Sequence, residues 1–593
     1  MKTIPARLLE QAENLGDRPA LFSKVGDAWK PTSWREYADR ARKVAKSLMA
    51  MGFESGDTTS ILGFNTEDWV VFDVGTMLAG GACAGIYTTC SPAEVQYIVD
   101  HSESKVALVR NKMQWEKIDA ERGNLPKLQK VVMMRGGEVV DDELLLSWDA
   151  FLALGESVSD EALLERLKAI EDDQLAQFIY TSGTTGPPKA VMLSHRNIAW
   201  TADCAVNDLA KLTSDDTTLS YLPLSHIAEQ MFTIHAPITA GSSVYFAESL
   251  EKLPDNLKEV QPTVLFGVPR IWEKFHAKVS ARMAEATGLK KAIADWAFAT
   301  GKEVSSARCE GRPVGGLLGI KYKMADSLVF SKAKPAMGLG KARICVTGAA
   351  PIAREILEFF AGLDLVIQEV YGQSEDCGPT SFNVMGRTRF GTVGPALPGT
   401  EVKIAEDGEI LVKGPHVFLG YYKDEAATNE TLIDGWLHTG DLGEFDADGF
   451  LKITGRKKEI IITAGGKNIA PKNIEAAIKN IDIVSQSVVI GDARKFLSAL
   501  ITLSPEDDAV KEFAQSLGIE VSRMHEDPRV IEHVQKQIDE FVNPQFARVE
   551  HIRKFTILPR DFTIADNELT PTLKIKRKYV NQNWSEVIEA MYA

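Results

Sequence analysis

Short β-rich runs alternate with helical segments in the first part of the chain, and this alternation restricts the fold more than any other feature. The β-rich runs include TTSILGF near residue 58, KVALVR at 105 and KVVMMR at 130. Between them lie helical patterns such as PAEVQYIVDHSE, and residues 34–51 carry apolar positions at helical spacing before Gly52. Alternation of this kind is typical of parallel sheets covered by helices, so the sequence predicts an α/β fold.

The length of the chain predicts at least two domains. The chain has 593 residues, which is too many for one compact domain. A charged segment at Arg456 to Glu459 separates two β-rich runs, and a helix, two further β-rich runs and a second helix follow. We therefore predict a large N-terminal domain (1–456) of parallel and mixed sheets covered by helices, and a small C-terminal α+β domain (457–593) joined to it at a hinge.

Residues 271–340 differ in composition from the rest of the N-terminal domain. They are rich in Ala and Lys, have a mostly helical pattern and contain a Gly-rich break, GRPVGGLLG. The simpler interpretation is a helical insertion on the surface. Basic amphipathic helices also lie on lipid, so a membrane-surface role for these Lys-bearing helices stays open.

Composition and charge argue against several classes of protein. The formal net charge of -15 argues against a general nucleic-acid binder, although local basic clusters are compatible with it. The N-terminus MKTIPARLLEQAEN lacks the apolar core of a secretory signal, and no window of 18 apolar residues predicts a membrane span. The six cysteines form no C-x-x-C pair, which fits a reducing cytoplasm better than a disulfide framework or a metal site.

The stretch YTSGTTGPPKAVMLSH (180–195) gathers small hydroxyl residues and glycines in front of one lysine. It follows a strand-like run, LAQFIY, and backbone N–H groups of such a turn converge on anions. Lys189 adds a point charge suited to phosphate. A Walker A loop is excluded, because Pro188 replaces its second Gly and Ala190 replaces its Ser or Thr. We predict a phosphate-binding loop; a flexible surface loop is the alternative, against which the order of these residues argues.

Five further motifs follow this loop in order. They are TGAAPI at 347, YGQSE at 371, GWLHTGDLG at 435, GRKKE at 455 and PTLKIKR at 571. The series resembles the adenylate-forming superfamily of acyl-CoA synthetases, luciferases and peptide-synthetase adenylation domains, over about residues 15–580. Within it, YLPLSHIAEQ, FGVPRIWEK, ADSLVFSKAKPAMG and HVFLGYYKDEAAT resemble the long-chain fatty acyl-CoA synthetases. KEIIITAGGKNIAP and GDARKFLSALITL resemble the "bubblegum" branch of that group.

This resemblance implies a reaction and its partners. A fatty acid would be activated with ATP and Mg²⁺ to an acyl-adenylate with release of pyrophosphate, and CoA would then give acyl-CoA and AMP. The implied catalytic residues are Lys574, Lys189 and Glu375, of which Glu375 would bind Mg²⁺. The implied nucleotide-binding residues are Thr181, Ser182, Gly183, Thr184, Thr185, Gly348, Ala349, Ala350, Glu369, Tyr371, Gly372, Ser374, Asp441 and Arg456. Peripheral membrane contact would suit a long-chain acid.

Several of these residues have plain structural alternatives. Tyr371 offers a flat face for adenine but also suits core packing. Asp441 suits two ribose hydroxyls and also a turn, and Glu375 alone would be a solvated acid. YGQSED is not a serine-hydrolase elbow, because Asp376 stands where that motif needs Gly. Ser374 stands where the family usually has Thr, and Val370 replaces a frequent Gly.

The resemblance also places a hinge, a CoA tunnel and an acyl pocket. Lys458 matches the hinge, and Gly465 and Gly466 match the loop that approaches the pantetheine. The acyl pocket would be lined by His226, Phe266 and Gly267, with a structural role as the alternative for His226. In the family a Gly usually precedes the late lysine, but Leu573 precedes Lys574 here, which leaves Lys576 as a competitor.

Two other functions remain open at this point. An adenylating ligase that loads a carrier protein would use the same motifs. An inactive nucleotide-binding homologue would keep the site without the reaction, and Leu573 is the departure that favours it.

Overall fold

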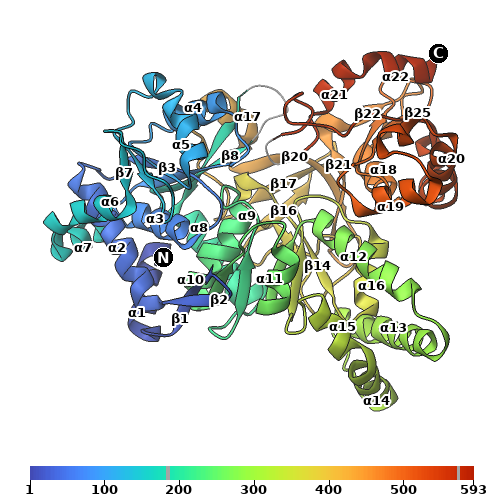
Figure 1. Ribbon diagram of the computed structural model, residues 1–593, viewed down its shortest axis with the longest axis horizontal. Coiled ribbons are helices and arrows are strands. Elements are labelled where there is room, and N and C mark those ends of the chain that lie inside the picture. The colour runs from blue at the N-terminus through green and yellow to red at the C-terminus, as the bar shows by residue number, and fades with distance from the viewer. Residues whose placement is uncertain (182–186, 571–573) are drawn as a thin grey trace.

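The computed structural model describes residues 1–181, 187–570 and 574–593. Within them, two eight-stranded sheets form the large domain (Figure 1). Their orders are β15-β14-β13-β12-β10-β11-β1-β2 and β18-β9-β8-β4-β3-β5-β6-β7, with parallel pairs at the centre and antiparallel pairs near the edges. The predicted α/β fold with parallel and mixed sheets is therefore confirmed.

The strands of the two large sheets include those that the sequence predicted. The first sheet consists of β1 (Pro19–Val25), β2 (Ala28–Ser33), β10 (Thr217–Ser220), β11 (Ser243–Phe246), β12 (Val264–Gly267), β13 (Ile344–Thr347), β14 (Ile367–Tyr371) and β15 (Ser381–Phe382). The second consists of β3 (Thr58–Leu62), β4 (Ala82–Ile86), β5 (Val106–Val109), β6 (Lys130–Met133), β7 (Leu145–Ser147), β8 (Leu175–Thr181), β9 (Lys189–Ser194) and β18 (Gly420–Tyr421). The predicted helices over 34–51 and PAEVQYIVDHSE are α2 (Trp34–Ala50) and α4 (Pro92–His101).

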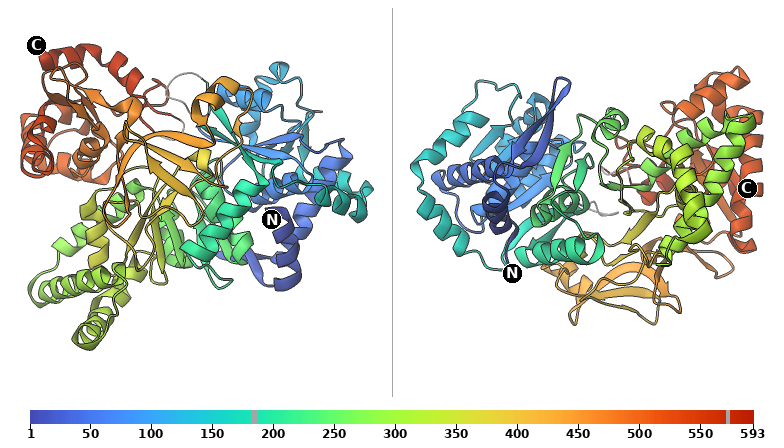
Figure 2. Two further views of the ribbon diagram at one scale, coloured as in Figure 1. Left: turned by 180° about the vertical axis from the view of Figure 1, so that it is seen from behind. Right: turned by 90° about the horizontal axis from the view of Figure 1, so that it is seen from below.

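A third, antiparallel sheet was not singled out from the sequence. It consists of β16 (Glu401–Ile404), β17 (Glu409–Lys413), β19 (Leu432–Ile433), β20 (Trp436–Phe445) and β21 (Leu451–Arg456). Figure 2 shows these yellow and orange strands near the middle of the molecule in its left view. The chain leaves this sheet through a single 3-10 turn, Lys457–Glu459, into the C-terminal region.

The C-terminal region has its own hydrophobic core. Its elements are β22 (Ile461–Ile462), β23 (Asn468–Ile469), α18 (Pro471–Ile478), β24 (Gln486–Ile490), β25 (Leu497–Thr502), α19 (Asp508–Leu517), α20 (Pro528–Gln537), β26 (Ile552–Ile557), α21 (Arg577–Asn583) and α22 (Ser585–Tyr592). Ile474 and Ile478 of α18 pack with Leu497, Ile501 and the buried face of α20. A second cluster joins Val488 and Leu500, on the other face of the strands, to α21 and α22, so helices cover both faces of this small sheet in an α+β unit.

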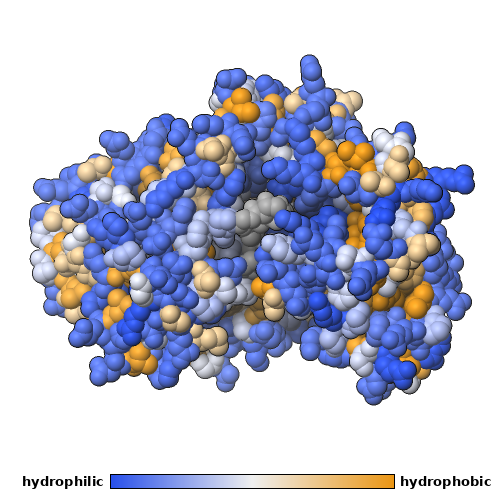
Figure 3. Space-filling view, turned by 90° about the horizontal axis from the view of Figure 1, so that it is seen from above, coloured by the Kyte–Doolittle hydropathy of each residue, from blue (hydrophilic) through white to orange (hydrophobic). Residues whose placement is uncertain are grey.

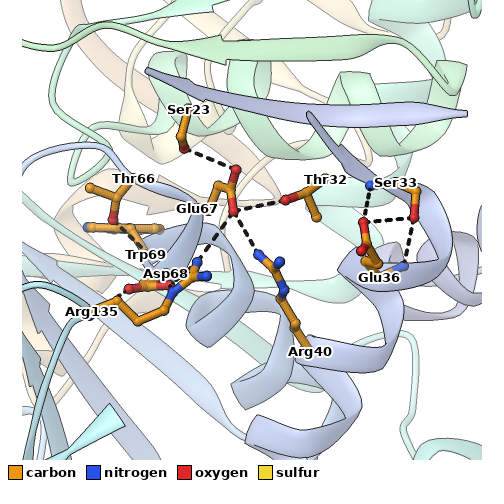
Figure 4. Close-up of polar contacts among 10 residues, drawn as sticks. All are labelled: Ser23, Thr32, Ser33, Glu36, Arg40, Thr66, Glu67, Asp68, Trp69 and Arg135. Atoms are coloured by element: carbon orange, nitrogen blue, oxygen red, sulfur yellow. Dashed lines mark hydrogen bonds and ion pairs between the residues drawn. The ribbon is translucent and has the colours of Figure 1, made fainter. Parts of the chain in front are cut away.

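The helix α3 (Glu67–Leu78) joins the two large sheets through one carboxylate (Figure 4). Glu67 accepts hydrogen bonds from Ser23 of β1 (3.0 Å) and Thr32 of β2 (3.1 Å), and it pairs with Arg40 of α2 at 2.7 Å. Arg135, which follows β6 of the other sheet, also reaches it at 3.3 Å. A buried carboxylate needs such partners, because desolvation of an unpaired charge costs several kcal/mol, on the order of 3–5 when one partner is removed.

Most of the segment 271–340 is helical in the structure. It contains most of α12 (Pro269–Ala284), followed by α13 (Gly288–Cys309), α14 (Gly316–Ala325), a π-helical stretch at Asp326–Phe330 and α15 (Ser331–Ala336). In Figure 1, α13 and α14 project from the body of the large domain. We call residues 288–336 the helical arm.

A second carboxyl of α3 is buried with an incomplete set of partners. Asp73 accepts a hydrogen bond from Gln177 of β8, and burial raises its pKa to about 7. Oδ2 of Asp73 and Oε1 of Gln177 are both buried acceptors without a donor. A proton on the carboxyl would supply a donor hydrogen here, so the neutral form suits this site better than the charged form.

We therefore predict that Asp73→Asn removes a pH dependence of stability. Folded Asp73 keeps its proton up to a pH of about 7, whereas the unfolded carboxyl loses it near 3.8, so the unfolded state binds fewer protons between these values. The contribution of this group to the free energy of unfolding falls, by on the order of 4 kcal/mol, as the pH rises through this window. Urea unfolding at pH 5 and pH 8 should show a smaller difference for Asp73→Asn than for the parent chain. An equal difference would contradict the prediction.

Candidate active site

Three sheets converge on one group of polar side chains. Strand β14 of the first sheet ends at Tyr371, β18 of the second ends at Tyr421, and β20 of the third carries Asp441. Figure 3 shows a hollow near the centre of the surface seen from above.

The first contact joins the second sheet to the loop after β14. The hydroxyl of Tyr421 donates a hydrogen bond to Oε1 of Glu375 at 2.7 Å. Because β18 pairs with β9 through Tyr421 and Val191, the Tyr421 ring lies near the start of β9. The ammonium of Lys189 lies 4.7 Å from the centre of this ring. The side chain of Tyr421 thus contacts a cation with its ring and a carboxylate with its hydroxyl.

The second contact joins the first sheet to the third. The hydroxyl of Tyr371 donates to Oδ2 of Asp441 at 2.9 Å, and Nε of Arg456 lies 3.2 Å from Oδ1 of Asp441. Antiparallel pairing of β20 with β21 places Asp441 opposite Arg456. Burial raises the pKa of Asp441, and Arg456 acts against that rise. The carboxylate therefore depends on its guanidinium partner to stay charged.

The loop after Tyr371 admits only glycine at its first position. A Cβ on Gly372 would lie 1.6 Å from the carbonyl oxygen of Gly378. The loop closes tightly here because Gln373 donates its backbone N–H to Asp376, and Gly378 donates to the carbonyl oxygen of Gln373. This closure, in which Ser374 is buried, turns Glu375 toward Tyr421. Only glycine, which has no Cβ, allows two backbone segments to approach this closely.

The small residues after β13 lie beside the same strand. Gly348 is buried against Val370, whose Cγ1 lies 2.5 Å from the position of a Cβ on Gly348. Ala349 and Ala350 are exposed, and Ala349 has a left-handed φ of 66°. Glu369 is buried, and burial raises its pKa to about 8, although it accepts a hydrogen bond from the backbone N–H of Gly391 at 3.0 Å.

Among the predicted acyl-pocket residues, Phe266 lies beside Gly348. Phe266 stacks on Phe232 with ring centres 4.9 Å apart, and its Cε2 lies 3.7 Å from the Cβ position of Gly348. Gly267 accepts a hydrogen bond from the indole of Trp272 at 2.9 Å. His226 caps α9 (Ile227–Gln230) by accepting the backbone N–H of Ala228 on Nδ1, at 3.2 Å.

The late lysine approaches this group from the C-terminal region. Lys574 keeps exposed surface, but the protein atoms around its ammonium displace water and lower its pKa. The cations of Arg456 and Lys472 lower this pKa further, while Glu375 and Asp441 oppose them. Charges shift a pKa only from nearby positions, so the ammonium of Lys574 lies near Arg456, Glu375 and Asp441 of the large domain.

The effect of Lys574 extends to the predicted acyl pocket. Burial lowers the pKa of His226 to about 4, and the charge of Lys574 contributes to that shift. The imidazole is therefore neutral at physiological pH. Lys576, the competitor of Lys574, instead lies 5.7 Å from the ring of Tyr579 in α21.

The remaining predicted residues that the structure describes lie in turns or at the end of a strand. Lys458 is exposed in the 3-10 turn that leads into the C-terminal region. Gly465 and Gly466 are exposed in the turn between β22 and β23, where Gly466 has a φ of 72°. Thr181 ends β8, and its hydroxyl donates to the carbonyl oxygen of Lys189 at 3.4 Å. Ser182, Gly183, Thr184, Thr185 and Leu573 lie outside the described residues.

Two residues of the cluster were not predicted from the sequence. Tyr421 lies within HVFLGYYKDEAAT, where an aromatic residue is usually part of the core, and its position after a Gly was the available signal. Lys472 of α18 pairs with Glu459 at 2.9 Å, and its charge affects both Lys574 and Asp441. Nothing in its local sequence distinguishes Lys472 from a solvated surface lysine.

The residues of the cluster fit a magnesium ion that is bound mainly through phosphate. Glu375 uses Oε1 for Tyr421, and Mg²⁺ commonly takes one or two carboxylates together with phosphate oxygens. In the part of the chain that the structure describes, no group of three His, Cys, Asp or Glu side chains could hold a metal ion. A metal at Glu375 would thus need oxygen ligands from a bound nucleotide.

Known proteins are similar to this chain along its whole length. The family model described as AMP-binding enzyme matches residues 8–422, and the model described as AMP-binding enzyme C-terminal domain matches residues 458–593. Long-chain-fatty-acid--CoA ligase ACSBG2 from Homo sapiens is 39% identical over 621 residues, covering 100% of this chain and 92% of that protein. Long-chain-fatty-acid--CoA ligase ACSBG1 from Rattus norvegicus is 37% identical, covering 100% of this chain and 85% of that protein.

Solved structures share the fold at lower identity. The adenylation domain of the carboxylic acid reductase from Segniliparus rugosus, in complex with AMP and a co-purified carboxylic acid, has a TM-score of 0.75 and 21% identity. The match covers 100% of this chain and 94% of the reductase chain. ATP-bound MatB from Rhodopseudomonas palustris has a TM-score of 0.69 and 23% identity, with 99% of each chain covered.

The close approach at Gly372 gives a testable prediction. Gly372→Ala forces the loop of Glu375 to move away from Gly378, and a shift of about 1 Å can cost about a hundredfold in a positioned site. We expect its affinity for ATP, measured by isothermal titration calorimetry, to fall at least about tenfold. Gly123→Ala is the matched control, because a Cβ on Gly123 meets nothing within 4 Å. Unchanged ATP affinity of Gly372→Ala would refute the prediction.

Proposed function

Since the chain belongs to the AMP-binding enzyme family, we propose that it is a long-chain fatty acid–CoA ligase. The observation that carries this proposal is the identity of 37–39% with long-chain-fatty-acid--CoA ligases along the full chain. The cluster around Glu375, Asp441 and Lys574 supports it, because it gathers the cations of Lys189, Arg456, Lys472 and Lys574 with two carboxylates and an aromatic side chain. These groups suit a nucleotide and a carboxylic acid.

The first half-reaction joins the carboxylate to AMP. A carboxylate oxygen of the fatty acid attacks the α-phosphorus of ATP, and the bond to the bridging oxygen of pyrophosphate breaks. We propose that Lys574 offsets the charge that develops on the α-phosphate oxygens, and that Lys189 and the hydroxyl loop hold the β- and γ-phosphates. Mg²⁺, held by Glu375 together with phosphate oxygens, would neutralise further phosphate charge. Asp441 would accept the ribose hydroxyls, and Tyr371 would stack on adenine.

The second half-reaction transfers the acyl group to CoA. The thiolate sulfur of CoA attacks the acyl carbon, and the bond to the AMP oxygen breaks, which gives acyl-CoA and AMP. We propose a domain boundary between residues 456 and 457 and a rotation of the C-terminal domain about Lys458 between the two steps. This rotation would remove Lys574 and bring Gly465 and Gly466 to the CoA tunnel, where glycine permits close approach of a ligand.

We propose that the protein works in the cytoplasm and contacts a membrane surface peripherally. In the described residues, no helix is long and apolar enough to cross a bilayer. The six cysteines are buried free thiols, which fits a reducing compartment. A long-chain fatty acid partitions into bilayers, so its ligase gains access to substrate at the bilayer surface.

The reaction can be tested by the mass of its products. We expect acyl-CoA, biased toward long chains, after incubation of the purified protein with ATP, Mg²⁺, CoA and a mixture of C8 to C20 fatty acids. Without CoA, only acyl-adenylate should form. Acyl-adenylate that never passes to CoA would instead indicate a carrier-loading ligase, and ATP binding without any adenylate would indicate an inactive homologue.

The role of Lys574 can be separated from folding by testing each half-reaction. Lys574→Ala should lower acyl-adenylate formation by about a hundredfold to a thousandfold, since one charge-stabilising donor contributes about that factor. It should leave the transfer of supplied acyl-adenylate to CoA within about twofold of the parent rate. The control is Lys576→Ala, two residues away, for which we expect a parental rate of adenylation. If the losses appeared in Lys576→Ala and not in Lys574→Ala, the assignment would be reversed.

A further inference from the structure

The helical arm carries a row of exposed apolar side chains. Leu317, Ile320, Met324 and Leu328 recur three or four residues apart along α14 and the stretch that continues it. Residues with this spacing share one face of a helix. Their exposed fractions are 71%, 60%, 52% and 46%, in this order. The same arm buries Tyr322, Ala325 and Phe330 in part or in full against α13, so these four residues form its outward face.

Basic residues flank this row, and acidic residues are almost absent. Residues 311–336 contain five basic residues and one acidic residue, a net charge of +4, although the whole chain has a net charge of -15. Lys321 follows Ile320 and Lys323 precedes Met324, so the two ammonium groups lie on either side of the apolar row. The single acid, Asp326, lies about half a turn from Met324, away from the row.

One buried carboxylate of the large domain contacts three helices of the arm, in addition to the packing of α13 against α16 (Arg354–Gly362). Asp364, which lies between α16 and β14, is paired with Arg308 of α13 and with Lys334 of α15. The hydroxyl of Tyr322 of α14 also donates to it, at 3.1 Å. Three helices of the arm are thus tied to one point. The apolar row is therefore presented on a fixed support.

We propose that this face of the arm is a docking surface for a lipid bilayer with anionic headgroups. Apolar side chains of such a helix insert into the boundary between headgroups and acyl chains, and the flanking lysines pair with phosphate groups. The charge of the arm, opposite to that of the chain, favours an anionic surface. It also keeps the acidic remainder of the protein from turning toward the bilayer.

A second copy of the chain fits this face less well. Two arms in contact would bring like charges together, which opposes association. A standard protein interface also needs about 20–30 residues on each side, whereas the row offers four side chains on one helix. A shallow contact with lipid needs only such a row.

The test is co-sedimentation of the full-length protein with vesicles, without any substrate. We expect binding to vesicles of equal parts phosphatidylcholine and phosphatidylglycerol, and at least about tenfold weaker binding to phosphatidylcholine alone. The variant Leu317→Ser/Ile320→Ser/Met324→Ser should lose at least about tenfold in binding, as should Lys321→Glu/Lys323→Glu. The three apolar side chains and Lys323 are exposed and Lys321 is half-buried, so the melting temperatures of both variants should match that of the parent chain.

A matched variant controls for general loss of apolar surface. Met113→Ser/Leu154→Ser/Phe541→Ser removes three exposed apolar side chains elsewhere, with exposed fractions of 63%, 40% and 58%, and should bind vesicles like the parent. Equal binding by parent and arm variants would overturn the proposal. A parent dimer that the arm variants convert to monomers, without vesicle binding, would assign the face to a second copy. Vesicle binding is measured without ATP or fatty acid, so this result is independent of the proposed reaction.

Discussion

Two tyrosine hydroxyls hold three sheets together at the point where the chemistry is proposed. Tyr421 bonds the edge of the second sheet to the loop after β14, and Tyr371 bonds the end of β14 to β20 of the third sheet. Hydrogen bonds to charged carboxylates contribute about 1.5–3 kcal/mol each, more than neutral ones. Both carboxylates are also candidate ligands, Glu375 for a metal and Asp441 for a ribose. The groups that position the sheets are therefore the same groups that would bind the nucleotide.

The charge balance of the cluster changes when the C-terminal region is added to it. The large domain alone offers Lys189 and Arg456 with two carboxylates, whereas the C-terminal region adds Lys574 and Lys472. Burial and the cations of Arg456 and Lys472 lower the pKa of Lys574, so its charged form is disfavoured in this arrangement. Phosphate oxygens would offset that cost. The arrangement with Lys574 in the cluster should thus be more stable with a nucleotide bound than without one, which couples domain position to the substrate.

The sequence predicted β3, β5, β6 and β8 of the second sheet, because each is a short β-rich run next to a helical segment or a motif loop. It did not single out the strands of the first sheet. It predicted the strand before Arg456 but missed the other strands of the third sheet, of which Leu432–Ile433 is only two residues long and whose turns are rich in Gly and Asp. Ordered motifs identified Glu375, Asp441 and Lys574 as candidates. They could not identify Tyr421, because its role depends on a partner 46 residues away that only the pairing of β18 with β9 brings near.

The helical arm and the candidate active site share one structural support. Asp364, which ties the arm together, is three residues before β14, and β14 ends at Tyr371 in the site. The chain runs from Asp364 directly into β14, which pairs with β13 from Ile367 to Glu369 and positions Tyr371 and the loop of Glu375. A bilayer bound by the arm would therefore fix the orientation of the site relative to the lipid. An acid that leaves that bilayer would then meet a pocket whose direction is already set, rather than one that tumbles freely above the surface.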